Sequence, residues 1–532
     1  MNSTYKTLIQ QFNASKSGME NQEPFYFDLE LQEDSVYRNV CILGGGIAGY
    51  LTALAFRRFF QLPVTIIESS KIPPIGVGEA TTPLMAEYLF GALGLDKKEF
   101  YEAVEPTWKL GIKFFWGKPG DYFFNYPFDS KDILSAYIHN NDINYCSLNS
   151  RLMSEDSSFV TRVEEDGELR YHSLSRTLKY AYHLDNQKFI GYLKQKSVEA
   201  GARLLDEEIK DAVLKDDGKE IDYLVNDQGD TFKFDMYVDC SGFRSLLLEK
   251  KLRSPYIPYK SSLYNDCAIT ATVPHGGKIQ CYTYAESMHN GWCWNIPLRH
   301  ENHRGYVFSS DFCSKEQAYE EMLMRNPTMS KDVNFIRFNS GRHQEFIKGN
   351  VVAIGNSYSF VEPLESTGVH MIIDQIIVLM NNFMNLKNKP RHISLLNRDM
   401  NDHWDYIRWF LSIHFKFNRK YNNSYWKSCR ANVDTSGFDH FIGLYKELGL
   451  LTRQDTTVKN MIRNDVKDTI FDLFGIDHIL FGQGILPNDI DRIRLENRDQ
   501  WEKNVSMWQE ILGYTIPLHE DLDVLLEHAH LM

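Results

Sequence analysis

The sequence of 532 residues predicts an α/β fold with a parallel sheet, an inserted β-sheet region and a helical C-terminal region. Short apolar segments at 40–43 and 64–67 flank a helical pattern, and this strand–helix–strand order is typical of a βαβ unit. Further buried strands are expected at 236–238 and 351–354, so other strands must be inserted between them. Beyond Arg391 the pattern becomes helical and aromatic.

A glycine-rich motif, G-x-G-x-x-G, directly follows the first strand and opens the helical pattern. Backbone N–H groups at such a helix N-terminus can hold a pyrophosphate, because glycine has no Cβ to block its approach. The predicted pyrophosphate-binding residues are Gly44, Gly46, Ile47, Ala48 and Gly49. Glu68 ends the second strand, where a carboxylate can accept hydrogen bonds from the ribose of an adenosine. This register predicts a Rossmann-like dinucleotide site rather than a glycine-rich turn beside a solvent-facing glutamate.

Two later segments favour a bound flavin over an exchanging nicotinamide. Asp239 ends a predicted strand and leads into a turn like those that close on the flavin in flavoproteins, and Gly355 ends another strand beside the cofactor. One full nucleotide fingerprint is visible. We therefore expect an FAD-binding domain of the glutathione-reductase/hydroxylase type, with a separate reductase supplying reduced flavin.

Charge and cysteine content restrict the classes of function. Lys and Arg number 58 against 71 Asp and Glu, giving a net charge of −13, which argues against nucleic acid or an anionic membrane as a partner. The eight cysteines form no C-x-x-C pair and no zinc-like spacing, so we expect no metal site and a reducing, cytoplasmic location. Neither a membrane span nor a secretory signal is expected.

Three further motifs resemble those of the flavin-dependent halogenases, the tryptophan halogenase-like family. They are G-V-G-E-A-T-T-P at 76–83, W-x-W-x-I-P at 292–297 and F-V-E-P-L-E-S-T-G at 360–368. Their joint occurrence in this order is highly specific, although each motif alone is not. The resemblance implies that FADH2, O2 and chloride, bromide or iodide form hypohalous acid, which halogenates an electron-rich aromatic ring. It also implies an NAD(P)H-dependent flavin reductase as partner and places Gly78, Glu79 and Ala80 at the cofactor.

With this resemblance, the chain divides into three expected regions. Residues 1–35 are polar and acidic and are expected to be a flexible extension. Residues 36–390 would form the FAD-binding and halogenase core with its inserted substrate-domain strands. Residues 391–532 would form a mostly helical region that covers the substrate. The sequence leaves open whether the chain forms a homo-oligomer.

Lys109 begins the segment K-L-G-I-K-F-F-W, in which apolar residues alternate. The pattern alone favours a solvated strand face shared by Lys109, Gly111 and Lys113. The resemblance instead implies that Lys109 is the catalytic lysine, which either polarises hypohalous acid or forms a haloamine. Lys113 shares the face without matching the motif and therefore serves as an internal control.

Glu365 could be an ordinary loop carboxylate, but the resemblance implies that it is catalytic and orients the electrophile or takes up the ring proton. Thr367 and Gly368 lead into an apolar helical pattern, so their backbone N–H groups are expected to bind the halide. Glu362 is expected to be structural.

Trp292 and Trp294 stand at i and i+2 and therefore point to one face of a strand, where they could simply pack in the core. In the family this segment lies near the flavin and is thought to discourage hydroxylation. The resemblance therefore implies that both residues are close to the flavin.

The substrate ring is expected to be smaller or less polar than free tryptophan. Family members that act on free tryptophan carry a tyrosine pair and several glutamates in a segment that corresponds to 468–475, where both are missing. A substituted indole, a phenol or another heteroarene would suit an aromatic pocket without paired charges. The predicted pocket residues are Phe123, Phe124, Asn125, Tyr126 and Ser366, although 123–128 could equally be a core strand.

Two alternatives share parts of this pattern. A flavin monooxygenase that hydroxylates an aromatic ring would use the same fold, and the mass of the product distinguishes it. A non-catalytic flavin-binding scaffold would bind FAD without forming a product.

Overall fold

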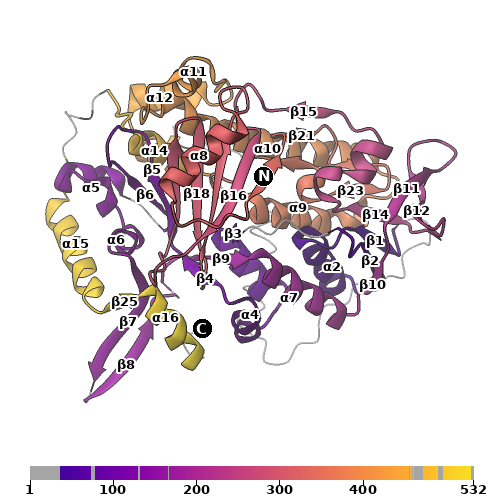
Figure 1. Cartoon of the computed structure of the whole chain (residues 1–532), viewed down its shortest axis with the longest axis horizontal. Helices are drawn as coiled ribbons and strands as arrows, with labels where there is room; N and C mark the ends of the chain where they lie inside the picture. Colours follow the sequence, from indigo (N-terminus) through magenta and orange to yellow (C-terminus); the bar gives the residue numbers. More distant parts are fainter. Residues whose placement is uncertain are drawn as a thin grey trace.

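The computed structural model describes residues 36–72, 78–129, 132–165, 167–175, 177–454, 456–457, 459, 471–488, 490, 495 and 497–528 (Figure 1). The expected extension at 1–35, Gly76 and Val77 of the second motif, and 468–470 lie outside these residues.

A six-stranded sheet carries the predicted nucleotide-binding unit. Neighbouring strands are parallel except at one edge, where the last pair is antiparallel. In spatial order the strands are β10 (Arg203–Asp206), β2 (Val64–Glu68), β1 (Val40–Leu43), β14 (Met236–Asp239), β23 (Val351–Ala353) and β22 (Ile347–Lys348). All four strands expected from the apolar segments are present, which confirms the predicted α/β fold. β1 is fully buried and leads directly into α2 (Ile47–Phe59), which packs against α7 (Asn186–Glu199) and α9 (Gly368–Asn382).

Seven of the strands that the chain inserts between β2 and β23 form a second sheet. It is antiparallel except for one parallel pair, β17 with β5. In spatial order its strands are β20 (Asn334–Arg337), β16 (Cys267–Val273), β19 (Asn302–Phe308), β18 (Gly291–Pro297), β17 (Thr283–Met288), β5 (Gly111–Phe115) and β6 (Phe124–Pro127). Figure 1 shows α8 (Lys315–Arg325) in front of β16 and β18.

A small antiparallel sheet brings the second motif beside the segment that contains Lys109. Its order is β3 (Gly78–Ala80), β9 (Ala181–Asp185) and β4 (Thr107–Lys109). β4 ends at Lys109 and β5 begins at Gly111, so the chain passes from the small sheet to the large one at Leu110, whose N–H donates to the Cys281 carbonyl (2.7 Å). The prediction of one continuous strand that contains both Lys109 and Lys113 is therefore wrong.

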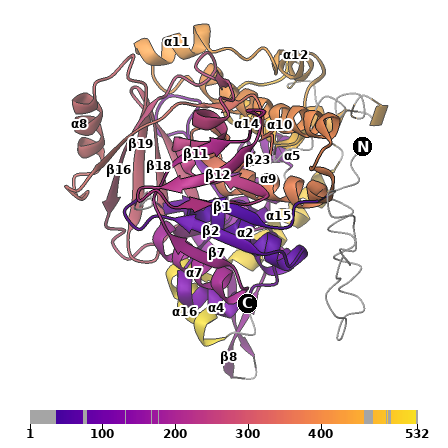
Figure 2. The ribbon, with the colours of Figure 1, turned by 90° about the vertical axis from the view of Figure 1, so that its right-hand side faces the viewer.

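Helices dominate the C-terminal region, which also returns to the core. The helices are α10 (Pro390–Phe417), α11 (Ser424–Asn432), α12 (Asp439–Leu448), α14 (Leu473–Gly482), α15 (Arg498–Leu512) and α16 (Leu518–Glu527). In both Figure 1 and Figure 2, α11 and α12 lie at the top of the molecule and α16 near the bottom. Strand β25 (Thr515–Pro517) pairs with β7 (Ser157–Glu165), which forms a hairpin with β8 (Glu168–Ser173).

The remaining strands form two further three-stranded sheets, and the remaining helices and turns are short. One sheet consists of β11 (Ile209–Leu214), β12 (Ile221–Asn226) and β13 (Thr231–Phe232), and the other of β15 (Tyr256–Pro258), β21 (Gly341–His343) and β24 (Ser359–Phe360). The other helices include α3 (Pro83–Ala86), α4 (Lys97–Val104), α5 (Ile133–Asn140) and α6 (Leu148–Ser154), with short turns η4 (Leu246–Lys251), η5 (Gly355–Ser357) and η7 (Leu451–Arg453).

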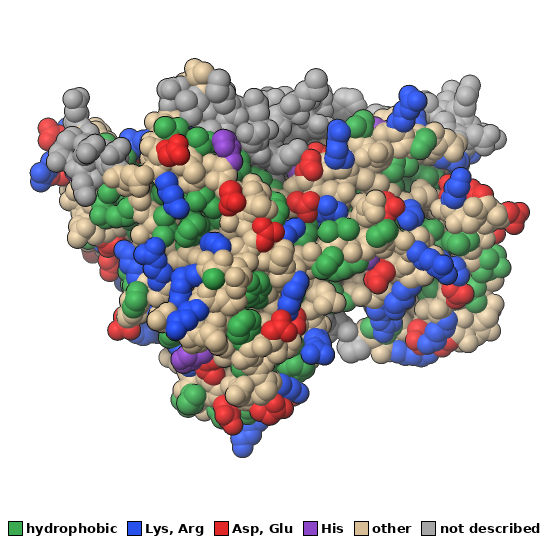
Figure 3. All heavy atoms as spheres, turned by 90° about the horizontal axis from the view of Figure 1, so that it is seen from above, with side chains coloured by type: hydrophobic (Ala, Val, Ile, Leu, Met, Phe, Trp, Pro, Cys, Tyr) green, Lys and Arg blue, Asp and Glu red, His purple; other side chains and the backbone are tan. Residues whose placement is uncertain are grey.

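The cysteines, the helix hydropathy and the surface charges can be compared with the expectations about metal, membrane and nucleic-acid partners. All eight cysteines lie in the described part and are free and buried. None of the described helices combines the length and hydropathy needed to cross a bilayer. On the face shown in Figure 3, basic and acidic side chains are interspersed.

Candidate active site

The fingerprint positions need glycine for different physical reasons: some avoid a clash within the protein, and one leaves space in front of a helix. A Cβ at Gly44, where φ is +128°, would lie 2.2 Å from the Cys240 carbonyl oxygen, and one at Gly49 would lie 2.0 Å from the Gly44 oxygen. These two glycines are required for packing. A Cβ at Gly46 would meet nothing within 4 Å, so open space lies in front of the N-terminus of α2. This space and the N–H groups of the first helical turn fit the pyrophosphate of a dinucleotide.

Gly45, an x position of the fingerprint, is also required to be glycine. A Cβ there would lie 1.6 Å from Glu68 Oε2. The same carboxylate accepts hydrogen bonds from the Tyr50 hydroxyl (2.5 Å) and Lys194 Nζ (2.6 Å). Glu68 is thus fixed at the end of β2 beside the glycine turn, and Tyr50 and Lys194 are supporting residues that the sequence did not indicate.

Asp239 and Gly355 shape the turns at the ends of β14 and β23. The Asp239 carboxylate accepts from the backbone N–H groups of Leu247 (2.8 Å) and Leu248 (3.0 Å) and from Ser241, so it fixes its own turn. Gly355 has a φ of +69°, and a Cβ there would lie 3.3 Å from Ala48 Cβ and 3.4 Å from Ile372. Gly355 therefore lies where α2 and α9 converge.

Strand β3 contacts the W-x-W-x-I-P strand, β18. A Cβ at Gly78 would lie 3.2 Å from the side chain of Ile296. Burial raises the pKa of Glu79 to about 7. The second and third motifs, far apart in sequence, are thus adjacent in the fold.

Trp292 and Trp294 share one face of β18, as expected, with ring centroids 5.8 Å apart. Trp292 Nε1 donates to Glu362 Oε2 (2.6 Å), which also accepts from Asn265 Nδ2 (2.7 Å). The Trp294 ring covers Gly305, where a Cβ would lie 1.9 Å from it. Burial raises the pKa of Glu362 to about 7, and this carboxyl group holds Trp292 in place.

Lys109 is fully buried, so the alternative of a solvated strand face is wrong. Its Nζ donates to Ser366 Oγ (2.7 Å) and lies 5.4 Å from the centroid of the Phe128 ring. Burial lowers the pKa of Lys109 to about 7, and the charge of Glu365 opposes part of that shift. A substantial fraction of this amine is therefore neutral near pH 7.

Lys113 lies in different surroundings. Its Nζ donates to the Met153 carbonyl (3.0 Å) and lies over the Tyr282 ring at 4.0 Å and the Phe123 ring at 5.1 Å. Burial lowers the pKa of Lys113 as well. Lys113 is thus a second buried amine that lacks the Ser366 contact, which preserves its value as a control.

Glu365 lies in the loop that leads into α9. It is buried, and its Oε1 is 2.7 Å from His414 Nε2. Ser366 has a left-handed φ of +59°, which turns the chain between Glu365 and the helix. Thr367 is the N-cap without a side-chain cap, and a Cβ at Gly368 would meet nothing within 4 Å. Open space therefore lies at the N-terminus of α9, as a small anion would require.

His183 is a buried residue that the sequence did not indicate. The Thr107 hydroxyl donates to the Pro297 carbonyl (2.5 Å), so His183 Nδ1 (3.1 Å) must donate to Thr107 and its Nε2 accepts from Thr283 (2.9 Å). Burial and then the charge of Lys109 hold the pKa of His183 well below its usual value. This neutral ring links β4, which carries Lys109, to β17, and the Thr107 hydroxyl links β4 to β18.

The five predicted pocket residues are not all brought together. Phe124 stacks on Phe114 with ring centroids 5.2 Å apart, whereas Phe123 lies on the Lys113 side of β6. Asn125 Nδ2 donates to the Ser150 carbonyl (2.9 Å) and to Ser154 Oγ (2.9 Å), so its side chain supports α6.

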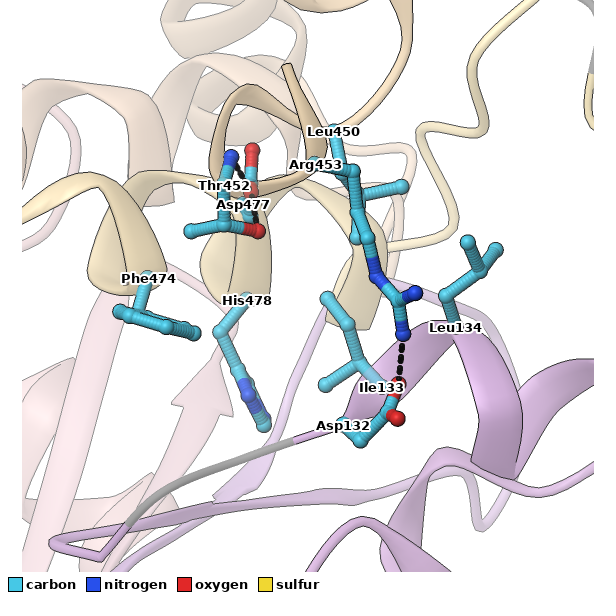
Figure 4. A pocket seen from close by; sticks show the side chains of 9 residues that line it. All are labelled: Asp132, Ile133, Leu134, Leu450, Thr452, Arg453, Phe474, Asp477 and His478. Carbon is cyan, nitrogen blue, oxygen red and sulfur yellow. Dashed lines mark hydrogen bonds and ion pairs between the residues drawn. The ribbon is translucent and has the colours of Figure 1, made fainter. Parts of the chain in front are cut away.

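Tyr126 is the predicted pocket residue that couples electrostatically to Glu365, and burial raises its pKa. Its ring centroid is 5.2 Å from that of His478, which lines a cavity of about 210 Å³ between α5, η7 and α14 (Figure 4). The lining residues are Asp132, Ile133, Leu134, Leu450, Thr452, Arg453, Phe474, Asp477 and His478. Arg453 pairs with Asp132 (2.6 Å), and Asp477 accepts from the Thr452 hydroxyl (2.7 Å). Tyr126 thus contacts a residue that lines this cavity and is close enough to Glu365 to interact with its charge.

Comparison with known proteins agrees with this geometry. The family model described as tryptophan halogenase matches residues 39–498. The 7-chloro-L-tryptophan 6-halogenase KtzR of Kutzneria sp. (strain 744) is 32% identical over 422 residues, 73% of this chain and 81% of that protein. The tryptophan 6-halogenase SttH of Streptomyces toxytricini is 32% identical over 428 residues, 74% of this chain and 81% of that protein.

Solved structures extend the likeness over nearly the whole chain. MibH, described as a lathipeptide tryptophan 5-halogenase, is 37% identical with a TM-score of 0.87, covering 94% of this chain and 97% of that one. BrvH, a flavin-dependent halogenase from Brevundimonas sp. BAL3, is 25% identical with a TM-score of 0.79, covering 92% of this chain and 100% of that one. These matches agree with the fingerprint glycines at α2, the buried Lys109 and the Glu365 carboxylate before α9. They establish that the chain belongs to the tryptophan halogenase family of flavin-dependent enzymes.

Proposed function

We propose that this halogenase transfers an oxidised halogen through the amine of Lys109 to an indole-type ring, with Glu365 taking up the ring proton. The observation that carries the proposal is the fully buried Lys109 amine, bonded to Ser366 beside Glu365. Family membership disfavours the hydroxylase and scaffold alternatives, because the chain retains the family's halogenase motifs in order.

The fingerprint glycines, with Ile47, Ala48 and Glu68, would hold FAD. The open space at Gly46 and the fixed Glu68 carboxylate fit its pyrophosphate and its adenosine ribose. When bound, FADH2 would supply two electrons that activate O2, and the activated oxygen can then oxidise the halide to hypohalous acid. We assign its supply to a separate NAD(P)H-dependent flavin reductase, since the sequence has one nucleotide fingerprint. Eight free cysteines and this reductant suit a cytoplasmic enzyme.

The halide would bind at the N-terminus of α9, to the backbone N–H groups of Thr367 and Gly368. The helix dipole favours an anion there, and the absence of a Cβ at Gly368 leaves room for it. A local site is needed because the net charge of −13 does not attract anions over long range.

Lys109 would activate the oxidised halogen in one of two ways. In the first, its neutral amine attacks the halogen of hypohalous acid, so that an N–halogen bond forms and the halogen–oxygen bond breaks; the released hydroxide takes one N–H proton from the amine and leaves as water. Alternatively, the protonated amine donates a hydrogen bond to the acid's oxygen and polarises it. The pKa of about 7 gives access to both forms of the amine near neutral pH.

Glu365 would act as general base. When the ring carbon bonds to the halogen, the bond that held the halogen to the Lys109 nitrogen, or to the acid's oxygen, breaks. The ring C–H bond then breaks, its electron pair returns to the ring, and the proton passes to the carboxylate, which can return it to the atom that released the halogen. Ser366 fixes the amine beside this carboxylate, because its hydroxyl accepts from Lys109 and it is the next residue in the chain.

Among the substituted indoles expected from the sequence, we favour one carried by a larger molecule, which departs from the expectation of a substrate smaller than free tryptophan. Asp472, the acid in the described part of the 468–475 segment, caps α14 by accepting from the Gly475 N–H (3.2 Å). The cavity beyond Tyr126 could hold the rest of the molecule. MibH is described as acting on a lathipeptide, so a tryptophan within a peptide is the first substituted indole to test.

The assay combines the purified protein, FAD, a flavin reductase, NADH, one halide and an indole, a phenol, free tryptophan or a tryptophan-containing peptide. Mass spectrometry should show halogen exchanged for hydrogen, and no product without the reductase. Lys109→Met should abolish the product and Lys113→Met should not. Loss of activity in Lys113→Met alone would overturn the assignment, and preference for free tryptophan would overturn the substrate proposal.

A further inference from the structure

His414 lies on α10 directly behind Glu365, and both of its ring nitrogens are engaged. Nε2 is 2.7 Å from Glu365 Oε1, and Nδ1 is 3.0 Å from the Phe410 carbonyl oxygen. The imidazole is fully buried, with the Phe114 and Phe410 rings at centroid distances of 5.5 Å and 5.3 Å.

Counting protons on this pair restricts its charge. The Phe410 carbonyl can only accept, so Nδ1 carries a hydrogen. A neutral ring protonated at Nδ1 presents a bare Nε2, which cannot bond to a bare carboxylate at 2.7 Å. The His414–Glu365 pair therefore holds one further proton, either on Nε2 or on Glu365.

The position of His414 in its helix favours the charged form of the ring. His414 lies in the last turn of α10, where the aligned peptide dipoles favour a cation. Adjacent aromatic rings favour a cation as well. The other ionisable groups that couple to Glu365 are Lys109 from β4 and Tyr126 from β6, and neither contacts His414 through a described hydrogen bond.

We propose that His414 is a positioning residue that keeps Glu365 ionised as the general base and balances its charge in place of Lys109. This inference rests on the proposed function of Glu365. With an imidazolium as counter-ion, Lys109 is free to exist as the neutral amine that attacks the halogen. The ring proton then passes to Oε2 of Glu365, because Oε1 is occupied by His414.

A measurement without turnover tests the protonation directly. In protein labelled with ¹⁵N-histidine, the signal lost in His414→Gln identifies the ring of His414. Shifts of a doubly protonated imidazole are expected in the buffer used for turnover. A neutral ring would overturn the proposal, whether or not the protein halogenates any ring.

Turnover gives a second, independent test with a ring-deuterated indole. His414→Gln keeps a hydrogen-bond donor toward Glu365 but carries no charge, so its rate of product formation should fall about 10-fold. His414→Phe keeps neither the donor nor the charge, and its rate should fall about 100-fold. Both variants should show a primary deuterium isotope effect above about 2, where the wild type shows none, because proton removal becomes slow.

His392→Gln, on the same helix and bonded to Asn382 instead, should match the wild type. Slower product formation without an isotope effect would show a merely structural role for His414, whereas a wild type inactive on every ring would refute the proposed function instead.

Discussion

Burial is the physical origin of the reactivity proposed for Lys109. An ammonium group loses its hydration in surroundings as dry as these, so its pKa falls to about 7. The neutral amine has a lone pair that can attack a halogen, whereas the ammonium has none. The free energy lost by burying the ammonium group is therefore what makes the nucleophilic amine available.

This coupling predicts the pH dependence of halogenation. Deprotonation of Lys109 is complete above its pKa, so the rate of product formation in a single turnover should rise through about pH 7 and then level off. Lys109→Arg should stay nearly inactive at every pH, because a guanidinium remains charged. A wild-type rate that is constant between pH 5.5 and 8.5 would contradict a role for the neutral amine.

Single residues also mark the limit of prediction from sequence. The motifs located Lys109, Glu365 and Trp292, but the alternating pattern around Lys109 indicated a solvated face that the structure does not have. Neither His183 nor His414 could be assigned a role from the sequence, because each becomes significant only through contacts made by chain folding. A lone histidine in an apolar helix resembles an ordinary core residue.

At the scale of elements, the N-termini of α2 and α9 meet at the Gly355 turn. Ala48 and Ile372 both face this turn, so the predicted nucleotide and halide sites lie on adjoining helix ends. The sequence predicted α2 and its flanking strands well, since their signals are local. It missed the break at Leu110, because apolar alternation looks the same in one strand and in two successive ones.

Two glycines, the N-cap Gly46 of α2 and Gly49 in its first turn, should separate cofactor binding from folding. A Cβ at Gly46 enters open space where the pyrophosphate would lie, so Gly46→Ala should weaken FAD binding at least 10-fold with little change in thermal stability. Gly49→Ala forces a Cβ against the Gly44 carbonyl, so it should lower the free energy of unfolding by roughly 2 kcal/mol or more. Fluorescence titration measures FAD affinity, and thermal unfolding measures stability. Normal FAD affinity in Gly46→Ala would refute the assignment of the pyrophosphate site to this helix N-terminus.

At the scale of the whole molecule, the C-terminal segment returns to support the strand that carries Lys109. Helix α16 packs against α4 and β4, and β25 extends the β7–β8 hairpin. The helical character of this region was predictable from its pattern. Its return to the core was not, because the pairing of β25 with β7 joins residues more than 350 positions apart.

The buried Asp521 of α16 makes this docking sensitive to pH. Burial raises the pKa of Asp521 well above its usual value. Between the unfolded pKa of about 4 and the raised folded pKa, the folded state holds a proton that the unfolded chain releases, so stability falls as pH rises. Asp521→Asn should therefore be more stable than the wild type by roughly 1 kcal/mol at pH 8, with less gain near pH 4. The exposed Asp523→Asn is the control, and equal unfolding of Asp521→Asn and wild type at pH 8 would exclude this effect.

The role of Lys109 as halogen carrier is tested most directly by following the oxidised halogen itself. Reduced Lys109→Met, supplied with O2, bromide and an indole, should consume FADH2 at the wild-type rate and release hypobromous acid, which taurine outside the protein traps as its bromamine. Wild type and Lys113→Met should instead deliver the bromine to the indole with little trapped by taurine. Bromoindole formed by Lys109→Met at the wild-type yield per FADH2 would contradict the account.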